Sequence, residues 1–228
     1  MTGASDWLRV LLVGYGRMGV LVDQLADEYG VTIVGRHTRA TPAEGNALLD
    51  ADVAIDFSAA DAVVKHAPRL AARGISLVIG TTGWAESEAQ VRAAVRDFPI
   101  GVIAAPNFAI GVNAFSAISE QAAELLVRRG FAPWIHEAHH ATKKDAPSGT
   151  ALALQAVVQT GGKPVDVSST RAGHIPGTHT VGFDSMSETV TLTHTARDRT
   201  PFARGALEAA RWIHGKQGWF TMRDMLGL

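Results

Sequence analysis

The chain contains no cysteine among its 228 residues. That absence excludes disulfide bonds and thiolate metal centres, and it fits a reducing compartment. Acidic and basic side chains nearly balance, at 22 and 21, so the charge indicates no nucleic-acid partner. No apolar run approaches the roughly 18 residues that cross a bilayer, and the first residues lack a secretory-signal pattern. We therefore expect a cytoplasmic protein that binds neither nucleic acid nor a membrane.

The first hundred residues alternate short apolar runs with amphipathic stretches. Strands are predicted at 8–13, 31–35, 51–57, 75–79 and 100–104, and helices at 18–29, 59–73 and 86–96. Ser58 is expected to cap the second of these helices. This alternation is typical of βαβ units, so it predicts an α/β fold with a Rossmann-type, doubly wound parallel sheet.

The pattern changes after residue 108. Helices are predicted at 113–129 and 148–160, and strands at 134–138, 165–170, 178–183 and 187–196. The last three strands are rich in Thr and Val, and we expect them to pair antiparallel. They predict a second α+β domain, residues 109–199, with an open mixed or antiparallel sheet. A final helix, 202–214, followed by a short tail, is expected to return to the first domain, which then comprises residues 1–108 and 200–228.

A glycine-rich turn follows the first predicted strand and opens the first predicted helix. In the pattern Gly14-x-Gly16-x-x-Gly19, the first glycine allows a tight turn and the second allows a pyrophosphate to approach the backbone. The third lets the helix pack closely on the strand. The motif predicts a dinucleotide site, with a purely structural turn as the alternative.

The end of the second predicted strand lacks the acidic residue that usually binds the adenosine ribose. It runs Gly35-Arg36-His37-Thr38-Arg39 instead, with two arginines and a hydroxyl. Such groups suit a 2′-phosphate, so we predict that NADPH is preferred and that NADH is still accepted. The alternative is a solvated basic turn.

Proton donors and anion-binding groups gather between residues 137 and 151. His139 and His140 precede Lys143, and histidine titrates near neutral pH, so it can act as a general acid. Pro147 then precedes a helix start at Ser148-Gly149-Thr150, where unpaired N–H groups can bind a carboxylate. Asp145 either orients Lys143 or begins the turn. The segment predicts a site that holds and protonates a small anion.

The histidines also allow two other interpretations. Three imidazoles, His136, His139 and His140, could bind zinc. Successive residues of a strand point to opposite faces, so the adjacent pair could share one ion only on an irregular loop. We therefore predict no metal. The pair could also be structural, with Lys143 solvated.

The chain resembles the dihydrodipicolinate reductases almost from end to end. The resemblance lies in Gly16-Arg17-Met18-Gly19, Asp56-Phe57-Ser58, Gly80-Thr81-Thr82-Gly83, Ala105-Pro106-Asn107-Phe108 and Gly111-Val112-Asn113, in the run from Glu137 to Ala151, in Arg171-Ala172-Gly173 and Gly177-Thr178-His179, and in the ending Met222-Arg223-Asp224-Met225-Leu226. It implies reduction of 4-hydroxy-tetrahydrodipicolinate (dihydrodipicolinate) to tetrahydrodipicolinate, in lysine and diaminopimelate biosynthesis, with hydride from NAD(P)H. It also implies a homotetramer built through the sheet of the second domain.

The resemblance assigns roles to particular residues. His139 is the implied acid/base and Lys143 the implied proton donor and substrate contact, while His140, Gly149 and Thr150 hold the dicarboxylate. The expected coenzyme-binding residues are Gly14, Tyr15, Gly16, Arg17, Met18, Gly19, Thr38, Arg39, Gly80, Thr81, Thr82, Ala105, Pro106, Asn107 and Phe108. Two alternatives stay open: another Rossmann dehydrogenase of an amino or semialdehyde substrate, and a non-catalytic dinucleotide-binding module.

Overall fold

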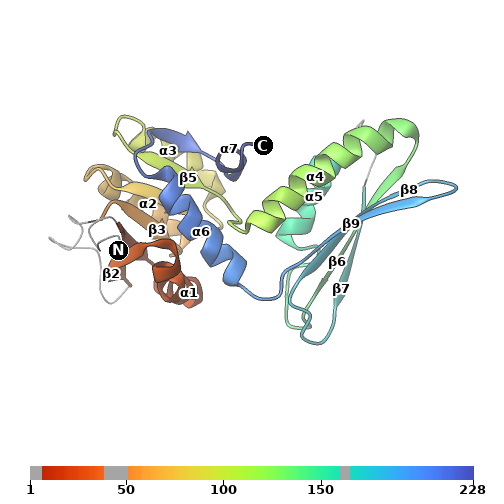
Figure 1. Ribbon diagram of the computed structural model, residues 1–228, viewed down its shortest axis with the longest axis horizontal. Coiled ribbons are helices and arrows are strands. Elements are labelled where there is room, and N and C mark those ends of the chain that lie inside the picture. Colours follow the sequence, from red (N-terminus) through yellow and green to blue (C-terminus); the bar gives the residue numbers. More distant parts are fainter. Residues whose placement is uncertain (1–6, 39–50, 160–164) are drawn as a thin grey trace. The chain divides into compact units, whose positions relative to one another are not determined.

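The computed structural model describes residues 7–38, 51–159 and 165–228 (Figure 1). The chain divides into two compact units, Met1–Ile110 with Thr200–Leu228, and Gly111–Arg199. Each unit has its own sheet. Along the described ranges, every helix is too short or too polar to traverse a lipid bilayer.

The first unit is built on a six-stranded parallel sheet. Its strands, in spatial order, are β10 (Gly218–Phe220), β5 (Gly101–Ala104), β4 (Ser76–Ile79), β3 (Val53–Asp56), β1 (Leu8–Val13) and β2 (Val31–His37). Every residue of β3 and β4 is buried, as expected for strands covered on both faces. This confirms the predicted Rossmann-type sheet.

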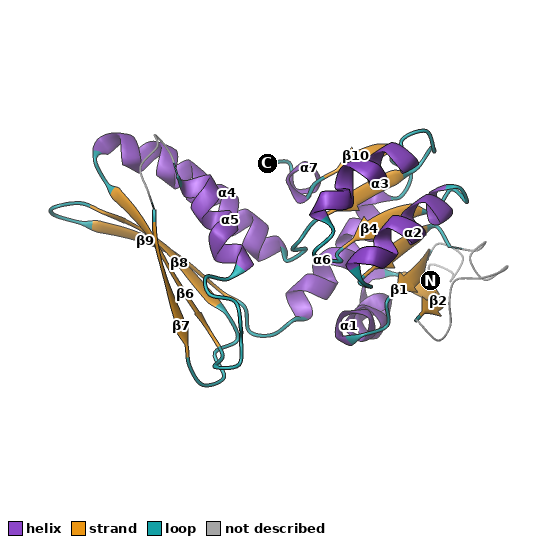
Figure 2. Ribbon diagram, turned by 180° about the vertical axis from the view of Figure 1, so that it is seen from behind, coloured by secondary structure: helices purple, strands orange, loops and turns teal. Residues whose placement is uncertain are grey.

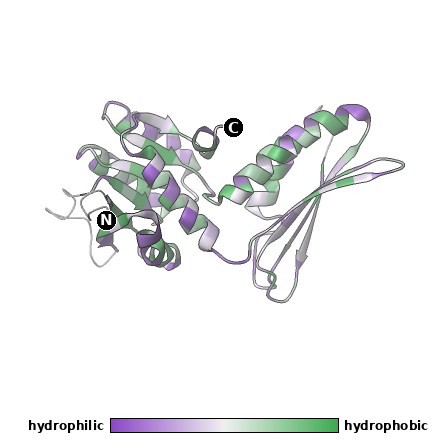
Figure 3. Cartoon of the chain, in the orientation of Figure 1, coloured by the Kyte–Doolittle hydropathy of each residue, from purple (hydrophilic) through white to green (hydrophobic). Residues whose placement is uncertain are grey.

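Helices cover both faces of this sheet. They are α1 (Arg17–Leu25), continued by the 3₁₀ turn η2 (Ala26–Tyr29), α2 (Ala60–Ala71), η4 (Ala85–Ser87), α3 (Glu88–Val95), α6 (Thr200–Ile213) and α7 (Met222–Leu226). One core contains Val10 and Leu12 of β1 with buried residues of α1 and α6. The other contains Leu11 and Val13 with α2 and α3, because successive strand side chains point to opposite faces. Figure 2 shows α2 and α3 in front of the sheet, and Figure 3 shows hydrophobic and hydrophilic residues interspersed along α6.

Two local predictions in this unit are wrong. Ser58 does not cap α2: the N-cap is Ala59, and the Ser58 hydroxyl instead donates to the buried Asp56 carboxylate at 2.6 Å. Leaving a buried carboxylate without hydrogen-bond donors costs more free energy than leaving a helix end without a side-chain cap. The predicted C-terminal tail is also structured, because Gly218–Phe220 adds β10 beside β5 and a capping box between Thr221 and Asp224 begins α7.

The second unit is a four-stranded sheet with helices on one face. The strand order is β7 (Asp166–Arg171), β6 (Ala132–His139), β8 (Thr178–Asp184) and β9 (Thr189–Thr195). The helices are α4 (Ile110–Leu126), with the 3₁₀ turn η5 (Val127–Arg129), and α5 (Gly149–Val158). Ile135 of β6 and Val181 of β8 pack against buried residues of both α4 and α5. This confirms the predicted second domain with a mixed sheet.

One pairing differs from the prediction. β8 and β9 run antiparallel, as expected, but β7 lies parallel to β6. The chain leaves β6, passes through α5 and returns beside β6, which is a βαβ crossover. That crossover pairs His139 with Arg171 in the register of the two strands.

Candidate active site

The glycine-rich loop has the geometry that a phosphate cradle requires. Gly14 has φ +90°, and a Cβ there would lie 2.4 Å from the Phe57 carbonyl oxygen. A Cβ on Gly19 would lie 2.4 Å from the Gly14 carbonyl oxygen, so the third glycine brings α1 close to the turn. A Cβ on Gly16 would meet nothing within 4 Å. The loop is therefore closed on the protein side and open where a pyrophosphate would approach, at the start of a helix.

The end of β2 is organised by an ion pair. The Arg36 guanidinium donates two hydrogen bonds of 2.7 Å to the Asp23 carboxylate. The Tyr15 hydroxyl donates to the same carboxylate at 2.5 Å. The hydrogen bond from Arg36 lowers the pKa of Asp23. Arg36 is thereby held in place by Asp23, and Thr38 lies exposed at the end of the described segment. Arg39 lies outside the described residues.

Asp56 connects the two loops that follow β3 and β4. Its side chain is buried, and its Oδ1 accepts from the Ser58 backbone N–H at 2.9 Å and from the Thr81 hydroxyl at 2.9 Å. The Ser58 N–H also donates to the Thr81 hydroxyl at 2.8 Å. These bonds set the path of the loop through Thr81, whose side chain faces Asp56 and is buried.

The remaining predicted coenzyme residues differ in exposure. Gly80 lies against the Phe57 ring, since a Cβ would approach the ring to 2.1 Å. The Phe108 side chain is a core residue that packs edge-on to Phe57, with ring centroids 6.5 Å apart. Exposed positions are Tyr15, Arg17, Thr82 and Pro106, while Met18, Ala105 and Asn107 are half-buried. The structure thus places these predicted residues after the carboxyl ends of β1, β4 and β5, and the side chain of Phe108 is buried.

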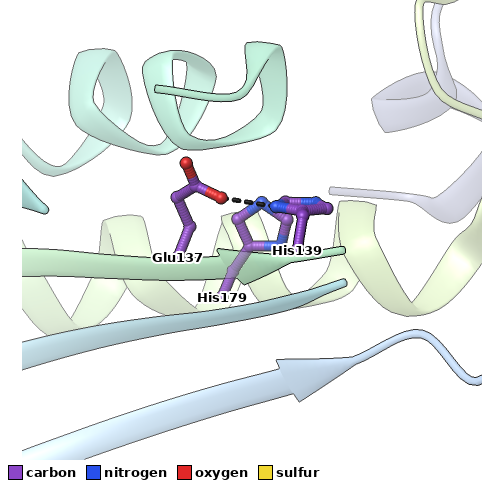
Figure 4. A group of neighbouring side chains, drawn as sticks. All are labelled: Glu137, His139 and His179. Atoms are coloured by element: carbon purple, nitrogen blue, oxygen red, sulfur yellow. Dashed lines mark hydrogen bonds and ion pairs between the residues drawn. The ribbon is translucent and has the colours of Figure 1, made fainter. Parts of the chain in front are cut away.

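In the second unit, His139 is held by a buried carboxylate. Glu137 and His139, two residues apart on β6, point to the same face, and His139 Nδ1 hydrogen bonds with Glu137 Oε2 (Figure 4). The Glu137 side chain is 0% exposed. Burial alone would raise its pKa, but hydrogen bonds from Arg171 and other neighbours outweigh burial and lower the pKa to about 2. Glu137 is therefore an anion at neutral pH, with His139 as one of its partners.

His139 is largely shielded from water, with 12% of its side chain exposed. Burial is the largest influence on its pKa and lowers it, the Glu137 carboxylate opposes that effect, and the charges of Lys143 and Arg171 reinforce it. Because Nδ1 faces Glu137, Nε2 is the ring nitrogen left for a substrate. An imidazole that is held by a carboxylate through one ring nitrogen suits proton transfer through the other.

His179 lies behind His139. The two rings meet edge-to-face with centroids 5.1 Å apart, and His179 Nε2 is 2.9 Å from the Ser148 hydroxyl. The same hydroxyl accepts the Ala151 N–H and so caps α5. Burial, followed by the charge of His139, lowers the pKa of His179 to about 4. His179 is therefore a neutral imidazole that supports both His139 and the start of α5.

Buried, neutral His179 should make this unit acid-sensitive. An unfolded chain binds a proton at His179 below about pH 6.5, whereas the folded chain resists protonation down to about pH 4. The free energy of unfolding should therefore fall by roughly 3 kcal/mol between these pH values, and the group contributes no loss above pH 6.5. Urea unfolding at several pH values should show a shallower acid slope in His179→Gln than in the wild type. His174→Gln, at an exposed position, is the control, and equal slopes in all three proteins would contradict the assignment.

Lys143 is paired with Asp145. Its ammonium nitrogen lies 2.7 and 2.9 Å from the two Asp145 carboxylate oxygens. Lys143 is the largest cause of the lowered pKa of Asp145, and the Gly149 backbone N–H also donates to that carboxylate. Asp145 therefore holds Lys143, one of the two roles predicted for it, and its carboxylate also accepts from the start of α5. A carboxylate already bridges the ammonium and a helix N-terminal N–H.

The predicted anion-binding residues lie around the same helix start. His140 Nδ1 is 2.8 Å from the Thr142 hydroxyl, and the His140 carbonyl accepts the Lys143 N–H. A Cβ on Gly149 would meet nothing within 4 Å, and Thr150 is half-buried in the first turn of α5. Each of these residues is close in the chain to Lys143 or to the capped helix end.

One cluster of side chains has enough donor atoms to hold a metal ion. Within residues 7–38, 51–159 and 165–228, ligand atoms of Glu137, His139 and His179 lie within 4.8 Å of one another. Both Glu137 oxygens, however, already accept from the Arg171 guanidinium, at 2.7 and 2.9 Å. An ion would have to displace that cation. His136, part of the zinc set considered from the sequence, instead pairs with Ser168 at 2.9 Å.

Sequence reasoning missed three residues of this cluster, Glu137, Arg171 and His179. Period-2 alternation on a strand places Glu137 on the face of His139, and that signal was available. Arg171 lies 34 residues from Glu137, and its approach depends on the parallel β7. His179 comes from β8.

Family models match both parts of the chain. One for the N-terminus of dihydrodipicolinate reductase matches residues 8–108, and one for its C-terminus matches residues 111–226. The chain belongs to the dihydrodipicolinate reductase family. The predictions of this family, and of an NAD(P)H-dependent reductase of lysine and diaminopimelate biosynthesis, are confirmed.

Individual relatives agree. The 4-hydroxy-tetrahydrodipicolinate reductase of Acidiphilium cryptum is 39% identical, with 100% of both chains covered. That of Methanosarcina mazei is 41% identical over 196 residues, 78% of this chain and 74% of its own. A dipicolinate-bound dihydrodipicolinate reductase from Paenisporosarcina sp. TG-14 superposes with a TM-score of 0.78 over 94% of this chain and 97% of the other. Its identity is 21%, so it shows the shared fold.

Proposed function

We propose that the chain reduces 4-hydroxy-tetrahydrodipicolinate (dihydrodipicolinate) to tetrahydrodipicolinate, with His139 and Lys143 as the proton-donating groups. One arrangement carries the proposal: a mostly buried imidazole held by a buried carboxylate, beside a lysine and a capped helix start. In a member of this family, these are the groups that a cyclic dicarboxylate needs.

The substrate carboxylates are assigned to the groups around the start of α5. Lys143 would exchange its partner Asp145 for a substrate carboxylate, so one ammonium–carboxylate ion pair would replace another. The open Gly149 would let that carboxylate reach the backbone N–H groups, and Thr150 would donate its hydroxyl. His140 would contribute its imidazole from the preceding turn. These contacts hold the ring with its reacting carbons near His139.

The proton comes from His139 or Lys143. Loss of water from the 4-hydroxy substrate would give the conjugated ring of dihydrodipicolinate, to which NAD(P)H, when bound, would supply a hydride and so become the oxidised coenzyme. The neighbouring ring carbon then takes one proton, so the ring gains two hydrogens. His139 can donate from Nε2 while Glu137 stabilises the imidazolium through Nδ1, and Lys143 can donate from the ammonium it presents to the carboxylate. The chain's own cations also offset the negative charge of the dicarboxylate.

The coenzyme is assigned to the glycine loop of the first unit. Gly14, Gly16 and Gly19 provide its phosphate cradle, and Thr38 with Arg39 would meet the adenosine side. We propose residues 1–108 with 200–228 as the dinucleotide-binding domain and residues 109–199 as the substrate-binding and oligomerisation domain. The homotetramer and the cytoplasmic location stay predictions.

Coupled turnover tests this function. Dihydrodipicolinate synthase would supply the substrate, and loss of reduced-nicotinamide absorbance would report reduction. Turnover that requires the synthase product is expected. NAD(P)H binding without turnover would instead indicate a dinucleotide-binding module, and turnover with an amino or semialdehyde substrate would indicate another dehydrogenase.

The same assay tests the coenzyme preference. We expect kcat/KM to be higher with NADPH than with NADH, because a basic residue at position 39 and the Thr38 hydroxyl suit a 2′-phosphate. Arg39→Ala should lower kcat/KM for NADPH by about tenfold, the loss of one charge-assisted contact, and leave NADH nearly unchanged. Arg73→Ala, at an exposed position in the same unit, is the control. A strong preference for NADH, with no effect of Arg39→Ala, would refute the assignment.

A further inference from the structure

We propose that Arg171 and Glu137 are positioning residues, and that the single Arg171 guanidinium sets the places of both candidate proton donors, His139 and Lys143. The inference rests on the proposed function of those two groups. It adds residues that reach the reaction only through their neighbours.

One branch runs from Arg171 to His139. Arg171 Nη2 donates to Glu137 Oε1 at 2.7 Å, and Nη1 donates to Glu137 Oε2 at 2.9 Å. Glu137 Oε2 then meets His139 Nδ1 (Figure 4). The Ser148 N–H adds a further bond to Glu137 Oε1 at 3.3 Å. A fork of two bonds fixes the plane of the carboxylate, and the carboxylate fixes the imidazole.

The other branch runs from Arg171 to Lys143. Arg171 Nη2 also donates to the Asp145 carbonyl oxygen, at 2.5 Å, and the Asp145 carboxylate holds the Lys143 ammonium. The guanidinium therefore ties the loop that carries Lys143 to the strand that carries His139. The Arg171 side chain is 16% exposed, so these bonds are largely shielded from water.

The strand pairing explains why Arg171 reaches both. His139 and Arg171 are register partners in the parallel pair, and the Ala172 N–H donates to the His139 carbonyl at 3.0 Å. Just beyond, the Ala141 N–H donates to the Gly173 carbonyl at 3.1 Å. The backbone bonds extend the pairing into the start of the Lys143 loop.

The charged groups around His139 decide how easily its imidazole is protonated. Glu137 faces it from its own strand, Arg171 from β7, His179 from β8 and Lys143 from the following loop. Glu137 is the one anion among them. In the neutral ring, Glu137 favours the tautomer with hydrogen on Nδ1. It also stabilises the imidazolium, whose Nε2–H then faces the substrate. Without this anion, the three cationic or ionisable neighbours would disfavour the protonated acid.

The first test is the pH profile of kcat in Glu137→Gln. The amide keeps the shape of the carboxylate and removes its charge. We expect the limb on which activity falls with rising pH to move about 1–3 units toward lower pH, since an attractive charge on His139 is lost. Asp166→Asn, an exposed carboxylate on β7, should leave the profile unchanged. Glu137→Asp retains the charge, so it should keep the limb near its original place even if kcat falls.

The second test is Arg171→Lys, which keeps a cation but loses the fork. We expect kcat to fall by about 10²-fold and KM to rise, because His139 and the Lys143 loop lose their common anchor. Thermal unfolding and dipicolinate binding would accompany both tests. If Glu137→Gln proves unfolded, Arg171→Lys and Glu137→Asp decide the question from the same profiles.

The outcomes separate this inference from the proposed function. A turnover loss in His139→Gln combined with an unshifted profile in folded Glu137→Gln would overturn the positioning role alone. Wild-type kcat and KM in folded Arg171→Lys would overturn the claim that Arg171 positions both His139 and Lys143. Undiminished turnover in His139→Gln and Lys143→Ala would instead overturn the proposed donors.

Discussion

His139→Gln is expected to lower kcat by about 10²–10⁴-fold, the usual contribution of a general acid. The glutamine amide can still donate a hydrogen bond to Glu137, but it cannot deliver a proton. The loss should fall mainly on kcat, because the substrate carboxylates are assigned to other groups. Steady-state kinetics with the coupled assay would measure it.

The matched control for this prediction is His136→Gln. His136 lies on the same strand with its side chain on the opposite face, where it pairs with Ser168. It should keep wild-type turnover. Full activity in His139→Gln would remove His139 as the acid and leave Lys143 as the proposed donor.

Lys143→Ala is expected to damage both binding and turnover. Lys143 is the cation closest in the chain to the His-His pair, and the structure shows its ammonium already bound to a carboxylate. Removing it takes away a partner of the substrate carboxylate and a candidate donor together. We expect kcat/KM to fall by about 10²–10³-fold, with KM raised and kcat lowered.

Lys144→Ala is the control for this second prediction, because it removes an exposed lysine from the next position of the same loop. It should leave both constants nearly unchanged. A rise in KM with kcat intact in Lys143→Ala would make Lys143 a binding group and leave proton delivery to His139. Equal effects of the two lysine variants would contradict any specific role for Lys143.

Much of the fold could be predicted from local patterns. Apolar runs such as Leu8–Val13, alternating with amphipathic helices, are enough to indicate a parallel sheet. The glycine spacing predicts the cradle, and the structure shows why Gly14 and Gly19 must be glycine, because a Cβ at either position would lie 2.4 Å from a carbonyl oxygen, whereas the side of Gly16 is open. The His139–Lys143 run and the helix start at Ser148 likewise lie within a few residues of one another.

What local patterns missed depends on contacts between distant segments. β10 has three residues, too few for a periodic signal, and it forms because β5 offers a free edge in the folded sheet. The parallel direction of β7 follows from the crossover through α5, although a strand–helix–strand order was visible in the sequence.

The amino-acid sequence was sufficient for the family, the two kinds of sheet and the residues that offer a proton or bind an anion, because those features are written in neighbouring positions. Folding was needed to unite Glu137 with Arg171 from another strand and His139 with His179 from a third. It also committed Arg36 to Asp23. A buried charge is stable only when partners from distant segments offset the cost of removing it from water. Tertiary packing therefore decides which charged side chains are buried and which groups they bind.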